Sequence, residues 1–382
     1  MQNRFWNHGK IVLIALVLLA YLPQAAEAIP AFARNYGKKC TVCHIQFPKL
    51  KDFGIAFKNR GYRMEDEEGE YVWKTKSIPI SVIAGFSYVN SKTDTGGVVT
   101  RSGEVVNDGA ELFAGGTLAP RISFFVDALT GDNRSLVQFD DILQNSALNI
   151  KAGDFNVDNY FLSRPRRLTA TGYLAQTGPE GTNGVTFANQ GLELNGQFID
   201  AGFRYLVGVG NDAATGSNHR FGNMAYVILN QSIKNHTISL QYKRDRTITT
   251  GSRIIDDTHS IGGAVELRPF KALIIDAAAY QFYGGDALKF TEDGRTKDFD
   301  VTSGTVEIIY AFTQKILGVA RFDWHDTNDS HAFQEQWVAS LQYYPAPNLK
   351  LNLEYFNKDI SIGAGTADSE EQSVILAATL GF

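Results

Sequence analysis

The only two cysteines of the 382-residue chain, Cys40 and Cys43, are separated by two residues and followed directly by His44. Two thiols at this spacing can bond to the two vinyl groups of one porphyrin, and the adjacent imidazole can then bind the iron as its proximal ligand. The pattern Cys-Thr-Val-Cys-His is typical of c-type haem attachment. We therefore predict one covalently attached haem c, held by Cys40, Cys43 and His44.

Other uses of a close cysteine pair fit the sequence less well. A thioredoxin-like redox pair requires a βαβ setting, and a structural zinc site requires two further cysteine or histidine ligands nearby. Neither follows the motif. The spacing also argues against a simple disulfide, which two cysteines of an exported protein would otherwise suggest.

The second axial ligand of the iron is predicted to be Met64, twenty residues after His44 in the same short segment. A methionine and histidine pair raises the reduction potential relative to two histidines. The alternative is that Met64 only fills a gap in a core. Five histidines farther along the chain could bind the iron only if the haem lies inside the body of the protein: His219, His236, His259, His325 and His331.

Residues 29–76 are predicted to form a small helical monohaem segment. About 48 residues are near the lower limit for independent folding, so a haem would supply much of the core. Phe47, Leu50, Phe53, Phe57 and Tyr62 recur mostly at three- and four-residue steps. This spacing predicts an amphipathic helix over 48–59, with Phe53 and Phe57 against the porphyrin.

The N-terminus predicts export from the cytoplasm. Arg4 and Lys10 precede an apolar run over residues 11–22, which is followed by Ala-Glu-Ala at 26–28. These features are typical of a signal peptide over residues 1–28. The apolar run of about 12 residues is too short for a membrane-spanning helix, which needs roughly 20.

Charge is unevenly distributed along the chain. Residues 29–76 hold ten Lys and Arg against six Asp and Glu, whereas residues 77–382 hold 24 against 34. A chain that is mildly acidic overall is a poor partner for nucleic acid. The basic segment and the acidic body are suited to docking on one another.

Residues 77–382 are predicted to form a transmembrane antiparallel β-barrel of about 16 strands, so the chain is mainly β. Apolar and polar residues alternate: Leu351, Leu353 and Tyr355 share one face, and Asn352 and Glu354 the other. Such weak alternation over about ten residues is typical of outer-membrane strands. The predicted strands are 78–90, 108–117, 121–130, 135–143, 146–155, 190–198, 201–210, 221–231, 236–247, 257–268, 272–284, 299–312, 316–327, 333–345, 349–360 and 370–382.

A soluble β-sandwich is the competing architecture, because it also has short alternating strands. Charged polar faces argue against it, as does the final alternating strand that ends at Phe382. Aromatic residues also gather at strand ends, as in the girdles of membrane barrels. They include Tyr343, Tyr344, Tyr355 and Phe356.

The longest predicted connection, at 156–189, contains Arg164, Arg166 and Arg167. It is similar to the constriction loop that folds into the lumen of sixteen-stranded porins. A solvated external loop with a basic stretch is the alternative, and the sequence does not decide between the two.

Residues 29–64, which carry the haem motif, together with the following barrel resemble the fused monohaem cytochrome-porins of the outer membrane of Gram-negative bacteria. The matching residues include Pro30-Ala31-Phe32-Ala33-Arg34, Pro48, Phe53-Gly54, Phe57 and Gly61-Tyr62. The resemblance implies a haem inside or capping a barrel that lies in outer-membrane lipid. It also implies electron transfer between extracellular Fe(II), or another redox partner, and a periplasmic cytochrome or other carrier.

Three functions follow from this resemblance. The first is an inward electron conduit, acting as an iron(II) oxidase by outer-sphere electron transfer. The second is the same conduit run outward to extracellular acceptors. The third is a diffusion porin with a haem-bearing plug. The sequence leaves open the direction of flow, the external partner, the oligomeric state and whether solutes pass.

A cluster of acidic and histidine residues after the thirteenth predicted strand is a candidate contact for iron. Carboxylate and imidazole groups suit divalent iron, and the strand count places this connection outside the cell. A solvated loop is the alternative. The cluster contains Asp323, His325, Asp326, Asp329 and His331.

Overall fold

The computed structural model describes residues 31–65, 67–75, 79–128, 133–163, 166–177, 184–185, 188–211, 221–248, 255–284, 289–292, 295–298, 300–327, 332–362 and 368–381. The predicted signal peptide at 1–28, the predicted domain boundary after residue 76 and the terminal Phe382 lie outside these residues. No helix in the described ranges is long and apolar enough to cross a bilayer.

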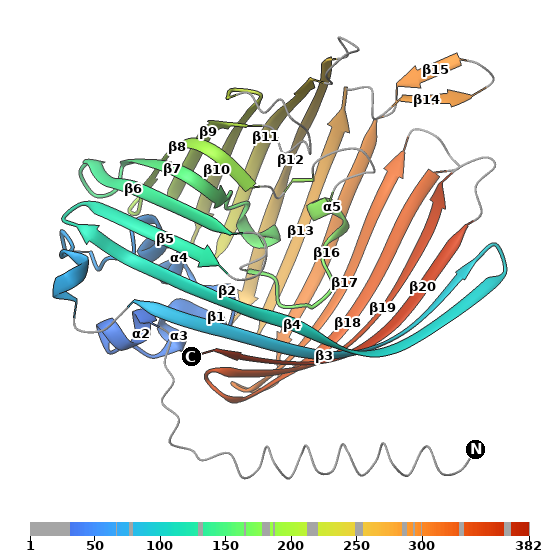
Figure 1. Cartoon of the computed structure of the whole chain (residues 1–382), viewed down its shortest axis with the longest axis horizontal. Helices are drawn as coiled ribbons and strands as arrows, with labels where there is room; N and C mark the ends of the chain where they lie inside the picture. Colours follow the sequence, from blue (N-terminus) through green and yellow to red (C-terminus); the bar gives the residue numbers. More distant parts are fainter. Residues whose placement is uncertain are drawn as a thin grey trace.

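Sixteen antiparallel strands close into one barrel (Figure 1), which confirms the predicted fold class. Each strand pairs with the next along the chain, and β20 closes the barrel on β3. The strands are β3 Ile80–Thr95, β4 Val98–Ala119, β5 Ile122–Ala128, β6 Arg134–Leu143, β7 Leu148–Asn156, β8 Ala188–Phe198, β9 Phe203–Gly210, β10 Met224–Ile233, β11 His236–Ile248, β12 Ile255–Phe270, β13 Leu273–Tyr283, β16 Val301–Ala311, β17 Ile316–Thr327, β18 Ala332–Ala346, β19 Leu349–Ile362 and β20 Ser369–Gly381.

The alternation of side chains along the strands matches the predicted faces. Leu353 is 48% exposed on the outer face of β19, while Asn352 and Glu354 are buried toward the lumen. Tyr343 and Tyr355 also point outward, as an aromatic girdle requires. Tyr344 was predicted in the same girdle, but this prediction is wrong, because its place in the alternation turns it into the lumen, where it is buried.

The connection predicted between residues 90 and 108 is instead part of a long hairpin. β3 and β4 continue to pair as far as Thr95 and Val98, and only Gly96 and Gly97 turn the chain. Both glycines have positive φ, of 57° and 84°, which tight hairpin turns require. A second short hairpin, β14 Lys289–Glu292 with β15 Arg295–Asp298, lies in the connection between β13 and β16.

The N-terminal segment, residues 31–75, forms a plug at the barrel end that carries the short turns (Figure 1). Short turns face the periplasm in bacterial barrels. The elements of the plug are α2 Ala31–Tyr36, α3 Cys40–Cys43, β1 His44–Gln46, β2 Lys49–Leu50, α4 Asp52–Asn59 and the 3-10 helix η1 Val72–Lys74.

The predicted helix over 48–59 is four residues too long. Lys49 and Leu50 pair with Gln46 and His44 in a small antiparallel ladder, so the chain is extended there and α4 begins only at Asp52. The extended backbone at Lys49 and Leu50 goes with this ladder and with the pairing of Lys49 to acidic residues of the barrel. The helix prediction is confirmed for its last two turns.

Candidate functional site: the cysteine motif and the lumen plug

The cysteine motif folds as one helical turn. Cys40 and Cys43 begin and end α3, so both thiols project from the same side of the helix. Both are free and half-buried, and burial raises the pKa of each thiol. The structure therefore brings together the two groups that a covalent porphyrin linkage needs.

His44 follows the helical turn with its ring held in one orientation. Its Nδ1 lies 3.1 Å from the carbonyl oxygen of Pro48 and donates a hydrogen bond there when it carries the proton. Burial lowers the pKa of His44 to about 4, so the imidazole is neutral at neutral pH. A backbone partner on one ring nitrogen leaves the other, Nε2, as the nitrogen that can bind a metal.

Helix α4 packs tightly against the cysteine motif. A Cβ atom at Gly54 would lie 2.4 Å from the carbonyl oxygen of Cys43, so only glycine permits this approach. The backbone N–H of Lys51 donates to the same oxygen at 2.8 Å, and Lys51 Nζ donates to the carbonyl of Thr41 at 2.6 Å. The first turn of α4 thus fixes the motif.

Aromatic side chains form most of the small core of the plug. The ring of Phe57 is buried and lies 5.6 Å from that of Phe32 and 5.4 Å from that of Tyr36. The ring of Phe53 is 38% exposed on α4, next to that of Phe57 at 6.5 Å. Met64 is half-buried at the end of the segment. Contact of Phe53 and Phe57 with a porphyrin, and of Met64 with iron, stay predictions.

Buried ion pairs hold the plug inside the barrel. Lys49, 1% exposed, places Nζ 2.6 Å from Asp276 Oδ2 and 3.2 Å from Glu266 Oε2. Arg63 Nη2 lies 2.7 Å from Asp141 Oδ2. These pairs join bases of the N-terminal segment to acids of strands β13, β12 and β6. The predicted docking of a basic segment on an acidic barrel is confirmed.

Hydrogen bonds between plug and wall complete the docking. The hydroxyl of Tyr344 donates to the carbonyl of Phe47 at 2.9 Å. The amides of Gln138 and Asn149 both donate to the carbonyl of Asn59 at 3.2 Å. At Gly61, where φ is +67°, a Cβ atom would lie 2.3 Å from the carboxylate of Asp140. The end of α4 therefore packs directly against the barrel wall.

The connection between β7 and β8, called here the inserted loop, folds into the lumen and meets the plug. Tyr160, Phe161 and Leu162 are buried in it, and Ile55 of α4 packs against their cluster. Of the two interpretations left open by the sequence, the inward one is confirmed. Arg166 is buried within this loop, and Arg164 lies outside the described residues.

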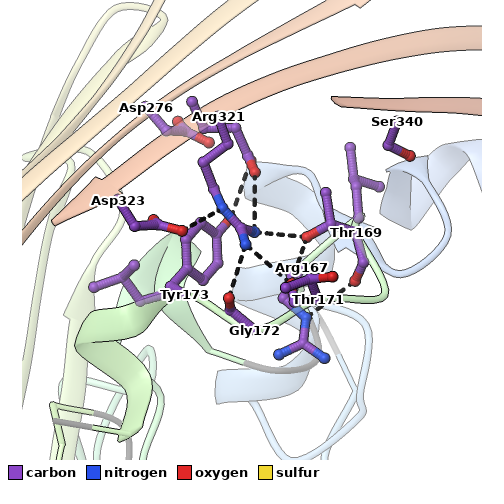
Figure 2. A network of polar contacts seen from close by, with 12 residues as sticks. Arg167, Thr169, Thr171, Gly172, Tyr173, Asp276, Arg321, Asp323 and Ser340 are labelled. Carbon is purple, nitrogen blue, oxygen red and sulfur yellow. Dashed lines mark hydrogen bonds and ion pairs between the residues drawn. The ribbon is translucent and has the colours of Figure 1, made fainter. Parts of the chain in front are cut away.

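Arg321 of β17 anchors the inserted loop to the opposite wall (Figure 2). Its guanidinium donates to Thr169 Oγ1 at 2.6 Å and to the carbonyl of Gly172 at 2.7 Å. Asp323 Oδ2 accepts from its Nε at 2.9 Å. The ring of Tyr173 lies 4.3 Å from the guanidinium carbon, and its hydroxyl donates to Glu307. The buried arginine thus directs most of its donors to the loop, while Asp323 of β17 and Glu307 of β16 balance its charge.

The predicted iron-binding cluster is not assembled as the sequence suggested. Asp323 is fully buried and committed to Arg321. His325 faces the lumen and is buried, whereas Asp326, the next residue, is exposed on the other face because strand residues alternate. Asp329 and His331 lie outside the described residues. Among the residues described, no group of three or more His, Cys, Asp and Glu could hold a metal ion.

Sequence reasoning missed the residues that join plug, loop and wall. Asp276 and Arg321 each stand on the polar face of a barrel strand, which predicts that they turn inward, whereas Lys49 lies in the plug. Nothing in a single sequence shows which charges pair, because Lys49 and Asp276 lie 227 positions apart.

Removal of Arg321 should release the inserted loop. In Arg321→Met, Asp323 and Glu307 lose a buried cationic partner, which costs about 3 kcal/mol or more. A protease added to the detergent-solubilised protein should then cleave the loop about 100-fold faster. Arg244→Met, which breaks a part-exposed pair with Asp257, is the matched control and should leave the rate unchanged. Equal protection in both variants would contradict an anchoring role.

Comparison with known proteins supports the barrel. No protein-family profile matches the chain, and no match was found among curated proteins. Among solved structures, an anion-selective porin from Comamonas acidovorans superposes with a TM-score of 0.57 over 80% of this chain and 99% of its own, at 13% identity. OmpT of Vibrio cholerae gives 0.54 over 80% and 99% at 11%. The outer membrane channel DcaP of Acinetobacter baumannii gives 0.53 over 79% and 97% at 10%.

Proposed function

We propose that this outer-membrane, porin-like barrel is an electron conduit between an extracellular donor, Fe(II), and a periplasmic carrier. One haem c, bound through Cys40, Cys43 and His44, would supply reversible one-electron chemistry. The observation that carries this proposal is the cysteine motif on a segment docked by buried ion pairs inside a closed barrel.

The membrane sets the physical requirement for such a conduit. Its hydrocarbon layer is roughly 30 Å thick, and a redox centre held wholly in the periplasm would leave most of that distance unbridged. The plug enters the lumen, where Ile55 of α4 meets the buried cluster of the inserted loop. Packed protein therefore extends from the plug to the inserted loop within the lumen. This supports electron tunnelling across a gap shorter than the hydrocarbon layer.

The residues around the motif suit a fixed axial ligand. The Pro48 carbonyl orients the ring of His44, and Gly54 brings α4 against the backbone of Cys43. A rigid axial ligand and a rigid attachment would keep the reorganisation energy small when the haem gains or loses an electron. Phe53, exposed on α4, offers an apolar surface for a porphyrin face.

Met64 is the proposed second axial ligand, and its replacement tests that role. Met64→Ala should remove the weak near-infrared sulfur-to-iron absorption band and lower the reduction potential of the haem. Met224→Ala changes a methionine buried in the barrel and should preserve the band. A parent protein without this band would instead point to a histidine or an open coordination site.

Passive diffusion is the second candidate function, with the plug as a haem-bearing stopper. The likeness of the barrel to porins favours this function more directly than it favours electron transfer. Outward electron transfer to extracellular acceptors would use the same residues as the inward conduit.

Conductance and redox measurements together test these functions. If the protein is a conduit, planar bilayers that contain it should show little ion conductance. In intact cells that express it, Fe(II) added outside should reduce the haem. The Cys40→Ala, Cys43→Ala variant is the control and should show no haem signal. Open, porin-like conductance without haem reduction by external reductants would favour passive diffusion instead.

A further inference from the structure

A second charged cluster lies where the plug, the inserted loop and the wall meet. Asp158 Oδ2 is 2.7 Å from Arg166 Nη2 of the loop, 3.0 Å from Arg204 Nη1 of β9 and 3.7 Å from Lys58 Nζ of α4. One carboxylate thus serves three cations that come from three parts of the fold. This cluster is separate from the cysteine motif and from the Lys49 pairs.

Positive charge exceeds negative charge at this point. Burial alone would raise the pKa of Asp158, but Arg166, Lys58 and Arg204 outweigh it and hold that pKa well below its ordinary value, so the carboxylate is ionised. No other carboxylate of the described residues lies within 4 Å of these three cations. Three basic side chains therefore surround one carboxylate, and two of them, Arg166 and Arg204, are buried.

One donor of the cluster is left without a partner. Arg204 is 7% exposed, and its Nη2 is buried and makes no hydrogen bond within the described part of the chain. Nη2 belongs to the same planar group as Nη1, which donates to Asp158 Oδ2 at 3.0 Å. A buried charged donor is costly to leave unsatisfied, which points to a further acceptor.

We propose that Lys58, Arg166 and Arg204 form a binding site for a small oxyanion of the phosphate class. Guanidinium groups match the oxygens of phosphate with paired donors, and lysine adds a compact positive charge. The side chain of Lys58 is 33% exposed, which gives solutes access to the edge of the site. Bound there, an anion would link plug, loop and wall. This site does not depend on the haem.

Isothermal titration of inorganic phosphate into the purified, detergent-solubilised protein tests this site. Saturable binding of one phosphate per chain is expected. Arg204→Gln should weaken binding by about tenfold or more, since it removes a charged donor. Arg121→Gln, at an exposed arginine paired with Glu68, is the matched control and should bind as the parent does.

A second variant should move the affinity in the opposite direction. Asp158→Asn removes the competing carboxylate but keeps its shape, so phosphate should bind several-fold more tightly. The Asp158→Asn variant can still test the site if Arg204→Gln does not form a heat-modifiable barrel. Absence of saturable binding in the parent protein would overturn the proposal. So would equal weakening by Arg121→Gln, or unchanged affinity in a folded Asp158→Asn variant.

Discussion

Replacement of Cys40 and Cys43 by alanine should abolish covalently bound haem completely. The chain has no other cysteine, so no thioether bond to a porphyrin can form in the double variant. Haem staining of the protein on a denaturing gel should fall to background, and the mass of the intact chain should lose the haem contribution. The barrel should survive, because its sixteen strands close without the motif.

The control for this experiment changes a neighbour within the motif. Thr41 lies between the cysteines and its side chain is exposed, so Thr41→Ala should keep full haem staining. Heat-modifiable migration on the gel reports whether each variant retains a folded barrel. Haem staining that persists in the double cysteine variant would refute covalent attachment at this motif, and with it the conduit.

The barrel could be predicted from the sequence because its signal is local and repeated. A strand is predicted from alternating residues followed by a turn. Apolar Leu353 lies on the outer face and polar Glu354 is buried toward the lumen, as their residue types predict. The Gly96-Gly97 pair between two alternating runs was also a hairpin signal, so that longer hairpin could have been found. The cysteine motif was equally local.

The arrangement inside the lumen could not be predicted in the same way. The same polar alternation fits an inward residue that meets the inserted loop and one that meets the plug, as Gln342 and Asp276 illustrate. The contact of Tyr344 with Phe47 and the partners of Arg321 depend on where the plug and the inserted loop lie. These are long-range contacts, which no short-period pattern encodes.

Loss of Lys49 should release the plug from the barrel. In Lys49→Met the carboxylate of Asp276 loses its basic partner while still buried, whereas Glu266 keeps Arg268. An uncompensated buried charge costs about 3–5 kcal/mol. The undocked population should therefore rise by about 100-fold or more, seen as higher ion conductance in planar bilayers and faster proteolysis of residues 31–75.

A second substitution distinguishes lost pairing from general damage. Asp276→Asn removes the stranded charge, so the Lys49→Met, Asp276→Asn double variant should regain most of the closed state. The coupling between the two sites, measured as a double-mutant cycle, should then be favourable by more than about 1 kcal/mol. Lys39→Met, at an exposed lysine of the plug, should leave conductance and proteolysis as in the parent. Strictly additive effects of the two substitutions would mean that the buried pair does not hold the plug, and that other contacts such as Tyr344 with Phe47 do so.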